Sequence, residues 1–273
     1  MNYSYLLGLP ASFAMGIMLG LTGGGGSILT LPIFVYIFHV SAQLSTSYSL
    51  LVVGMVASFG AFHAYRNKEL DLRLALAFGI PGIFGVKFSR NILLPLLPEK
   101  IAIANYAWSK DSLLLIAFAI LMLVVASNML RAATLKQVLG KTQSVSDSKI
   151  SPLCYVQGFL TGALAGFVGA GGGFILVPAL MHFANLEMKK AVGTSLLIIA
   201  LQSLLGISSD RAFFENADYR LLLSVLGVAI IGMQGGSTLR HRISPAKLKK
   251  AFGIFVFLMG IIIFVKEIRG IAT

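Results

Sequence analysis

The chain has 273 residues, of which 57% are hydrophobic and only 12% are charged, and its formal net charge is +12. A soluble domain carries about 25% charged residues, so this composition excludes a protein whose surface faces water on all sides. The excess of lysine and arginine is typical of cytoplasmic loops that lie against anionic lipid headgroups. A nucleic-acid partner is not expected, because no basic run is interleaved with aromatic residues.

Five apolar segments follow one another in the first half, and about 20 apolar residues are needed to cross a bilayer. A glycine run separates the first segment from the second, and the second is too short to cross alone. The stretch 90–110 is interpreted as a loop or surface segment, because it carries two prolines and several charges. The predicted apolar segments are 4–21, 28–38, 43–65, 72–88 and 112–130.

The second half repeats this order after a polar linker at residues 132–151. Its apolar segments are 152–168, 174–183, 191–208, 219–234 and 248–265. The sequence therefore predicts an all-α integral membrane protein of about 8–10 helices. We expect a first transmembrane repeat at 1–131, a cytoplasmic linker at 132–151 and a second transmembrane repeat at 152–273.

Two glycine-rich stretches carry the evidence for a duplication. Residues 20–32 read GLTGGGGSILTLP and residues 166–178 read GFVGAGGGFILVP, at an offset of 146 residues. The same offset pairs Ser49 with Ser195, and one residue more pairs Asp71-Leu72-Arg73 with Asp218-Tyr219-Arg220. Each repeat is therefore predicted to be a glycine-broken helical pair followed by three transmembrane helices.

The positive charges predict the orientation of the spans. The linker and the loop after 219–234 are both rich in lysine and arginine, so both are expected in the cytoplasm. Counting spans from these two loops gives an odd number of crossings per repeat, so the repeats are predicted to have inverted topology. Arg90, Lys100 and Lys110 count against this topology, which places them outside.

The glycine runs 23–26 and 169–173 are predicted to form an anion site. Consecutive glycines let the backbone unwind, and unwound backbone at membrane depth is tolerated only where it is buried in protein or lines a wet cavity. Short helices that begin near Ser27 and Gly173 would converge with free N–H groups and positive dipole ends, which attract anions. Inverted repeats with such broken helices are typical of secondary transporters.

The candidate site residues combine these glycines with hydroxyl groups that match between the repeats. The substrate-binding candidates are Gly23, Gly24, Gly25, Gly26, Ser27, Ser49, Gly169, Gly171, Gly172, Gly173 and Ser195. Accessory candidates are Thr22, Tyr48, Thr194, Gln202 and Lys87. For Lys87, snorkelling is favoured over a role in guiding anions. For Gly16, Gly20, Gly162 and Gly166, close helix packing is favoured over a site.

The acidic residues favour an anionic substrate by their positions. None of the 10 lies in the middle of a predicted span, where cation transporters and proton relays usually place a carboxylate. Asp71 and Asp218 each precede a span by one residue and are interpreted as helix N-caps. No catalytic, metal or nucleotide motif is present, so we expect no enzyme activity, no catalytic residue, no cofactor and no metal.

At the two glycine stretches the sequence resembles the TauE/SafE sulfite exporter family of membrane permeases. The segments LSTSYSL at 44–50 and KAVGTSL at 190–196 and the Asp-x-Arg openings at Asp71 and Asp218 also resemble that family. The resemblance covers nearly the whole chain apart from 90–110. It implies a multi-pass carrier in the inner membrane of a bacterium or archaeon.

The same resemblance implies export of sulfite, sulfoacetate or a related organosulfur anion, with Gly25, Ser49, Gly171 and Ser195 lining the pathway. We therefore expect a secondary transporter that works by alternating access, with a small anion and the lipid bilayer as its partners. Two alternatives stay open. The first is a carrier for another small anion, and the second is a membrane scaffold or assembly factor in which the glycine breaks serve packing alone.

Overall fold

The computed structural model describes residues 3–97, 100–103, 106–139, 152–169, 173–184, 186–208, 213, 215, 217–239 and 245–272. The first half of the chain forms α1 (Tyr3–Thr22), η1 (Gly25–Leu29), α2 (Thr30–Pro32), η2 (Ile33–Ile37), α3 (Ala42–Arg66), α4 (Leu72–Phe88), η3 (Ser89–Leu93), α5 (Leu94–Leu96) and α6 (Lys110–Leu139). The second half forms α7 (Pro152–Val168), α8 (Gly173–Phe183), α9 (Met188–Ile207), α11 (Tyr219–Leu239) and α12 (Pro245–Ala272). The predicted all-α class is confirmed.

Six helices in the described part of the chain are long and apolar enough to cross a membrane, by length and composition. They are Ser4–Thr22, Ala42–Arg66, Leu72–Leu96, Lys110–Ser127, Met188–Ile207 and Tyr219–Leu239. Two shorter apolar helices, Gly25–Ile37 and Pro152–Val168, accompany them. The predicted segments 4–21, 43–65, 112–130, 191–208 and 219–234 lie close to these bounds, because a run of apolar side chains long enough to cross hydrocarbon is a strong signal. The predicted segment 72–88 is shorter than the span Leu72–Leu96, and 248–265 is not among the six.

The interpretation of 90–110 as a loop or surface segment is wrong. The helix begun by α4 continues to Leu96 through the wide turn η3, so that Arg90 lies inside a span of 25 residues and is buried. Beyond it, β1 (Lys100–Ile103) and β2 (Tyr106–Ser109) pair as an antiparallel hairpin with Ile101 opposite Trp108. The first polar residues after Phe88 therefore do not end the helix, because hydroxyl groups of α3 receive the guanidinium of Arg90.

The chain packs as two compact units. The first comprises Met1–Leu94 and Val145–Arg242, and the second comprises Pro95–Ser144 and Ile243–Thr273. The first unit thus holds α1, α3 and α4 of one predicted repeat with α7, α8, α9 and α11 of the other. In the second unit, α6 packs against α12, its counterpart in the other predicted repeat. The repeat and linker boundaries themselves stay a prediction.

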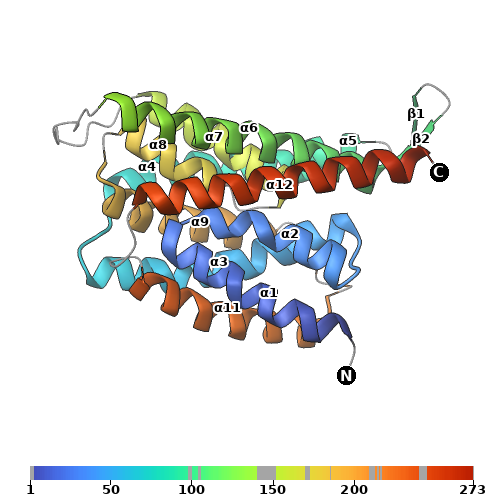
Figure 1. The fold of residues 1–273 in the computed structure, drawn as a ribbon, viewed down its shortest axis with the longest axis horizontal. Helices are drawn as coiled ribbons and strands as arrows, with labels where there is room; N and C mark the ends of the chain where they lie inside the picture. Colours follow the sequence, from blue (N-terminus) through green and yellow to red (C-terminus); the bar gives the residue numbers. More distant parts are fainter. Residues whose placement is uncertain are drawn as a thin grey trace. The chain divides into compact units, whose positions relative to one another are not determined.

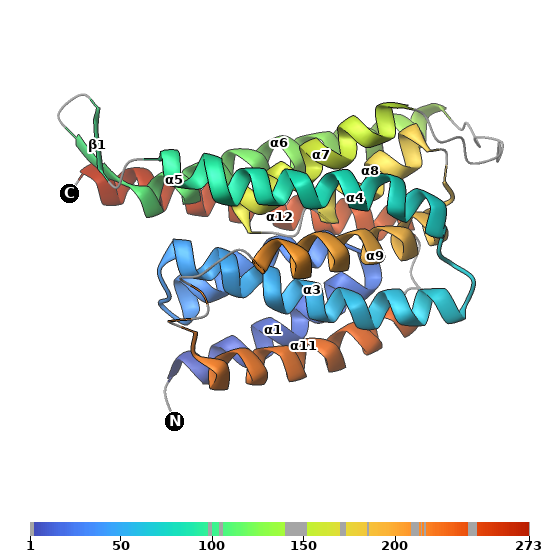
Figure 2. The same ribbon diagram turned by 180° about the vertical axis from the view of Figure 1, so that it is seen from behind.

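In the first unit, helices pack across the repeats. Figures 1 and 2 show α1 beside α11, and α4 lies along α7. A methyl group on Gly16 would overlap the carbonyl group of Ala229, and one on Gly162 would overlap that of Gly82. These two contacts are equivalent under the sequence repeat. Gly20 and Gly166 approach the partner backbone in the same way, which confirms the packing interpretation of all four glycines.

The helices α3 and α9 form the core of this unit. Each has 72% of its apolar window buried, against 44% for α1 and 39% for α11. They run antiparallel, because Gly54 faces Leu204 whereas Gly60, further along α3, faces Leu196, earlier in α9. The outer helices expose large apolar side chains such as those of Leu7 and Ile231, as expected for a surface solvated by lipid.

The close contact of α4 with α7 predicts that Gly162→Ala destabilises the protein. Alanine in place of helical glycine gains at most about 1 kcal/mol, whereas overpacking against a backbone carbonyl costs about 1–3 kcal/mol, so the clash dominates. The midpoint of thermal unfolding in detergent should fall. The matched control is Gly227→Ala on α11, where an added methyl group meets nothing within 4 Å. Equal midpoints for the two variants would contradict the packing.

Candidate functional site

Each glycine run begins with the same left-handed turn. Gly23 and Gly169 both have φ +73°, a conformation that glycine adopts without the steric penalty of a Cβ atom. The N–H of Gly23 donates to the carbonyl of Leu19 and that of Gly169 to the carbonyl of Ala165, both at 2.8 Å. These bonds close the ends of α1 and α7. The chain then enters a second, shorter helix in both repeats, as predicted.

The two glycine breaks meet backbone to backbone. A methyl group on Gly24 would overlap the carbonyl of Gly173, and one on Gly173 would lie 2.6 Å from Cα of Gly24. Only residues without a side chain allow this approach. The predicted convergence of the two breaks is therefore confirmed, although Gly171 and Gly172 lie outside the described residues.

The first break is held by bonds within its own turn. Thr22 Oγ1 donates to the carbonyl of Met18 at 2.7 Å and accepts the N–H of Gly25 at 2.9 Å. Both the N–H and the Oγ of Ser27 donate to the carbonyl of Gly24, at 3.1 and 2.6 Å. A side chain on Gly26 would collide with α1. The N–H groups of Gly25 and Ser27 are thus engaged inside the chain, so the prediction that this helix start presents free N–H groups is wrong for these two groups.

Ser49 and Ser195 differ in their bonds, although both are fully buried. Ser195 Oγ lies 2.8 Å from the carbonyl oxygens of Gly23 and of Val192 and donates to them. It therefore ties α9 to the first break. Ser49 Oγ has no hydrogen-bond partner among the described residues. A buried hydroxyl without a partner is destabilising, so Ser49 is the member of the pair suited to receive a ligand.

Tyr48 and Thr194 occupy equivalent positions and make equivalent bonds across the repeats. Tyr48 Oη accepts the N–H of Asp218 at 2.6 Å, and Thr194 Oγ1 accepts the N–H of Asp71 at 3.0 Å. The carboxylates of Asp71 and Asp218 accept N–H groups of the first turns of α4 and α11. The N-cap interpretation is therefore confirmed, and Tyr48 and Thr194 position the starts of these two helices.

Gln202 is a further buried polar group on α9. It lies beside Gly82 of α4, and both its amide atoms lack a partner among the described residues. Its neighbour Ser203 lies beside Gly54 of α3 and has an equally unpartnered hydroxyl. Polar groups buried without partners are rare in native proteins. Lys87 is half-buried on α4.

Arg90 is the functional candidate that the sequence analysis missed. It is 9% exposed and is the only charged side chain among the buried residues that the structure describes. Its Nη1 donates to Ser47 Oγ and its Nη2 to Thr46 Oγ1, both at 3.0 Å. Thr46 in turn packs against the left-handed Gly169 of the second break. A fixed positive charge thus lies one residue away from the glycine site.

A signal for Arg90 was present in the sequence. The apolar character of α4 resumes after Arg90, and the window Leu72–Leu96 keeps a mean hydropathy of 1.4. Basic residues inside a span face the protein interior and are functional by default. The two prolines that follow obscured this continuity.

The sequence profile of the family "Sulfite exporter TauE/SafE" matches residues 8–263. A "Probable membrane transporter protein" of Xylella fastidiosa (strain Temecula1) is 28% identical to the chain, over 94% of each protein. The "Probable membrane transporter protein YdhB" of Bacillus subtilis (strain 168) is 24% identical over 92% of this chain and 96% of its own length.

An archaeal relative, the "Probable membrane transporter protein MJ0441" of Methanocaldococcus jannaschii, is 31% identical over 38% of this chain and 41% of its own length. No solved structure is significantly similar to the chain. The profile match spans both glycine breaks, the core helices α3 and α9 and the buried Arg90. The chain is a membrane transporter that belongs to the TauE/SafE sulfite exporter family.

Proposed function

We propose that this transporter exports sulfite or a related small organosulfur anion across the inner membrane of a bacterium or archaeon. The observation that carries the proposal is the meeting of the two glycine breaks at Gly24 and Gly173, together with the buried Arg90, which bonds to the Thr46 that packs against Gly169. Helix breaks that converge inside a bundle are the usual construction of a transporter site. Arg90 supports a negative charge on the substrate, since a guanidinium presents a planar set of donors to oxyanions.

The predicted inverted topology fits this function and is part of the proposal. Two helices related by inversion should run antiparallel, and α3 and α9 do so. The exchanged pairs α1–α11 and α4–α7 have equivalent glycine contacts. A carrier built this way reaches its second state when the two repeats exchange conformations, which opens the same site to the opposite face.

The alternatives are a carrier for another small anion and a membrane scaffold that transports nothing. A direct measurement of flux separates these functions. Purified protein in liposomes should take up radiolabelled sulfite faster than protein-free liposomes. Unlabelled sulfite or sulfoacetate should compete, and chloride should not. If an unrelated anion competed and neither sulfite nor sulfoacetate did, that anion would replace sulfite as the proposed substrate. The absence of flux for every anion tested would overturn the transport proposal and favour the scaffold.

The unpartnered hydroxyl predicts a selective effect of Ser49→Ala. If Ser49 donates to the anion, its loss removes a hydrogen bond to a charged group, which is about 1.5–3 kcal/mol or about tenfold to a hundredfold in affinity. The KM for sulfite uptake should rise while thermal stability stays unchanged or increases. The control is Ser12→Ala, because the equally buried Ser12 bonds to Gly8 within α1. An unchanged KM for Ser49→Ala would exclude this serine from the site.

A further inference from the structure

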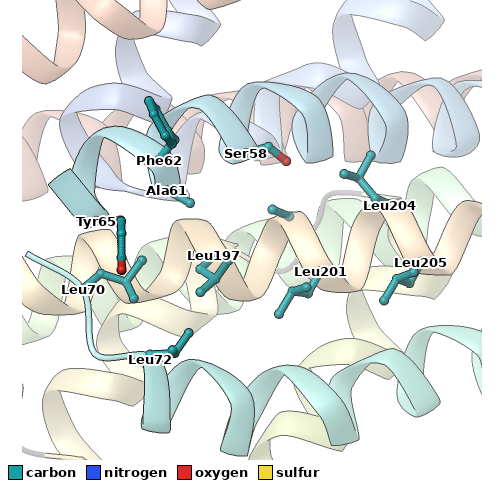
Figure 3. A pocket seen from close by; sticks show the side chains of 11 residues that line it. Ser58, Ala61, Phe62, Tyr65, Leu70, Leu72, Leu197, Leu201, Leu204 and Leu205 are labelled. Carbon is teal, nitrogen blue, oxygen red and sulfur yellow. The ribbon is translucent and has the colours of Figure 1, made fainter.

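An apolar groove lies on the first unit, away from the glycine breaks. It has a volume of about 410 Å³ and is formed by α3, α9 and the start of α4. Figure 3 shows Tyr65, Leu70 and Leu72 gathered at one end, with Leu204 and Leu205 at the other. The groove therefore runs along about 12 Å of α9, given a rise of about 1.5 Å per residue between Leu197 and Leu205.

The walls of this groove are almost entirely hydrocarbon. Leucine side chains of α9 line one wall, and Phe62 of α3, which is 63% exposed, lines the other. The hydroxyl of Ser58, which also lines the groove, already donates to the carbonyl of Gly54 at 2.8 Å. An occupant must therefore be apolar along this length.

Basic residues lie at the end of the groove near Tyr65. The guanidinium carbon of Arg66 lies 5.9 Å from the centre of the Phe62 ring, so a cation directly adjoins the apolar wall. In the sequence, Lys68 lies two residues before the lining residue Leu70 and Arg73 directly follows Leu72, and both basic side chains are exposed. Because Gly193 touches the carbonyl of Glu69, the start of α9 also belongs to this end.

Charges at this end are predominantly positive. The basic residues are Arg66, Lys68, Arg73, Lys189 and Lys190, and all are exposed. The acidic residues are Glu69, Asp71 and Glu187. The carboxylate of Asp71 already accepts the N–H of Leu74. By the positive-inside rule, this end faces the cytoplasmic leaflet, which carries the anionic lipids.

We propose that this groove binds a phospholipid with an anionic headgroup. One acyl chain lies between α3 and α9, and the phosphate lies among Arg66, Lys68 and the lysines that begin α9. The argument rests on the combination of an apolar groove with a cationic end, since each half of an anionic lipid matches one of them. The proposal is independent of which anion the protein transports.

The test compares lipids that differ in one part only. Purified protein in detergent is titrated with phosphatidylglycerol or phosphatidylcholine of identical acyl chains, or with glycerol phosphate, and bound lipid is measured by native mass spectrometry. Phosphatidylglycerol should bind more tightly than phosphatidylcholine, and glycerol phosphate should not bind. A basic residue near the membrane surface contributes about 1 kcal/mol, so Arg66→Gln with Lys68→Gln should weaken phosphatidylglycerol binding by about thirtyfold.

The matched control is Arg131→Gln with Lys250→Gln, which removes two exposed basic residues of the second unit. Equal losses for both double variants would show general charge attraction and overturn the proposal. Ser58→Phe, which fills the groove, should also abolish phosphatidylglycerol binding. Retained phosphatidylglycerol binding in Ser58→Phe would overturn the proposal. A lipid-free dimer that light scattering detects and that Ser58→Phe dissociates would also overturn it, and would assign the groove to a second copy of the chain.

Discussion

Replacing Arg90 by glutamine is expected to reduce sulfite flux by about tenfold to a hundredfold. Hydrogen bonds to a charged group are about 1.5–3 kcal/mol, which corresponds to that range of affinity. Glutamine keeps donors close to Ser47 and Thr46 but removes the charge. The effect should appear chiefly as a higher KM in proteoliposome uptake, because the charge attracts the anion before any conformational change.

Two controls separate a binding role of Arg90 from a structural one. Arg90→Lys keeps the charge but loses the planar fork that reaches two hydroxyls at once, so intermediate flux is expected. Arg131→Gln removes an exposed charge of α6 and should transport like the unchanged protein. Unaltered flux in Arg90→Gln with an unaltered unfolding midpoint would contradict the role. If Arg90→Gln does not fold, the charge requirement is tested with two other variants. Flux in a stable Arg90→Lys and none in a stable Arg90→Met would show that the charge is required, and equal flux in both would contradict it.

Arg90 also marks the limit of what could be predicted from the sequence. Hydropathy alone places the spans, as the agreement of 43–65 with Ala42–Arg66 shows. It ended the span that begins with α4 at Phe88, because the next residues are polar, whereas the span continues to Leu96. Whether an arginine ends a helix or is buried depends on the hydroxyls that α3 brings to it. Those contacts join residues 43 and 44 positions apart, which no local pattern contains.

The duplication predicted which helices of the two repeats are equivalent, but not which helices pack against each other. The sequence matches paired α1 with α7 and α4 with α11. The structure shows that partners are exchanged, with α1 against α11 and α4 against α7. The repeat also suggested equal roles for Ser49 and Ser195, whereas only Ser195 bonds to a glycine break. A local difference of this kind follows from packing, which the residue types alone do not determine.

The asymmetry between the repeats extends to the charge. One residue beyond the repeat offset, Arg90 pairs with Ser237 on α11, so the second repeat has no cation at this position. At the repeat offset of 146 itself, the hydroxyl-bearing residues Thr46 and Ser47 pair with Val192 and Gly193. The left-handed turns at Gly23 and Gly169 are duplicated, but the groups that would distinguish an anion from a neutral solute are not. Substrate selectivity is therefore expected to depend on residues of the first repeat, and the glycine breaks of both repeats to provide the moving parts.

Gly24→Ala and Gly173→Ala are each expected to reduce transport strongly but measurably, and the double variant to be no worse than either alone. Each added methyl group occupies the contact between the two breaks and meets backbone atoms of the other break, and on Gly173 it also meets the side chain of Ile199. Mutations that disturb one contact are not additive, whereas independent sites add. The unchanged protein, the two single variants and the double variant form a double-mutant cycle. Strong coupling between the two positions is expected in the initial transport rates and in the unfolding midpoints.

The control Gly235→Ala, where an added methyl group meets nothing within 4 Å, should retain transport. Additive effects at Gly24 and Gly173 would mean that the breaks act separately, and normal transport in both single variants would reduce the glycine runs to packing, as the scaffold alternative requires.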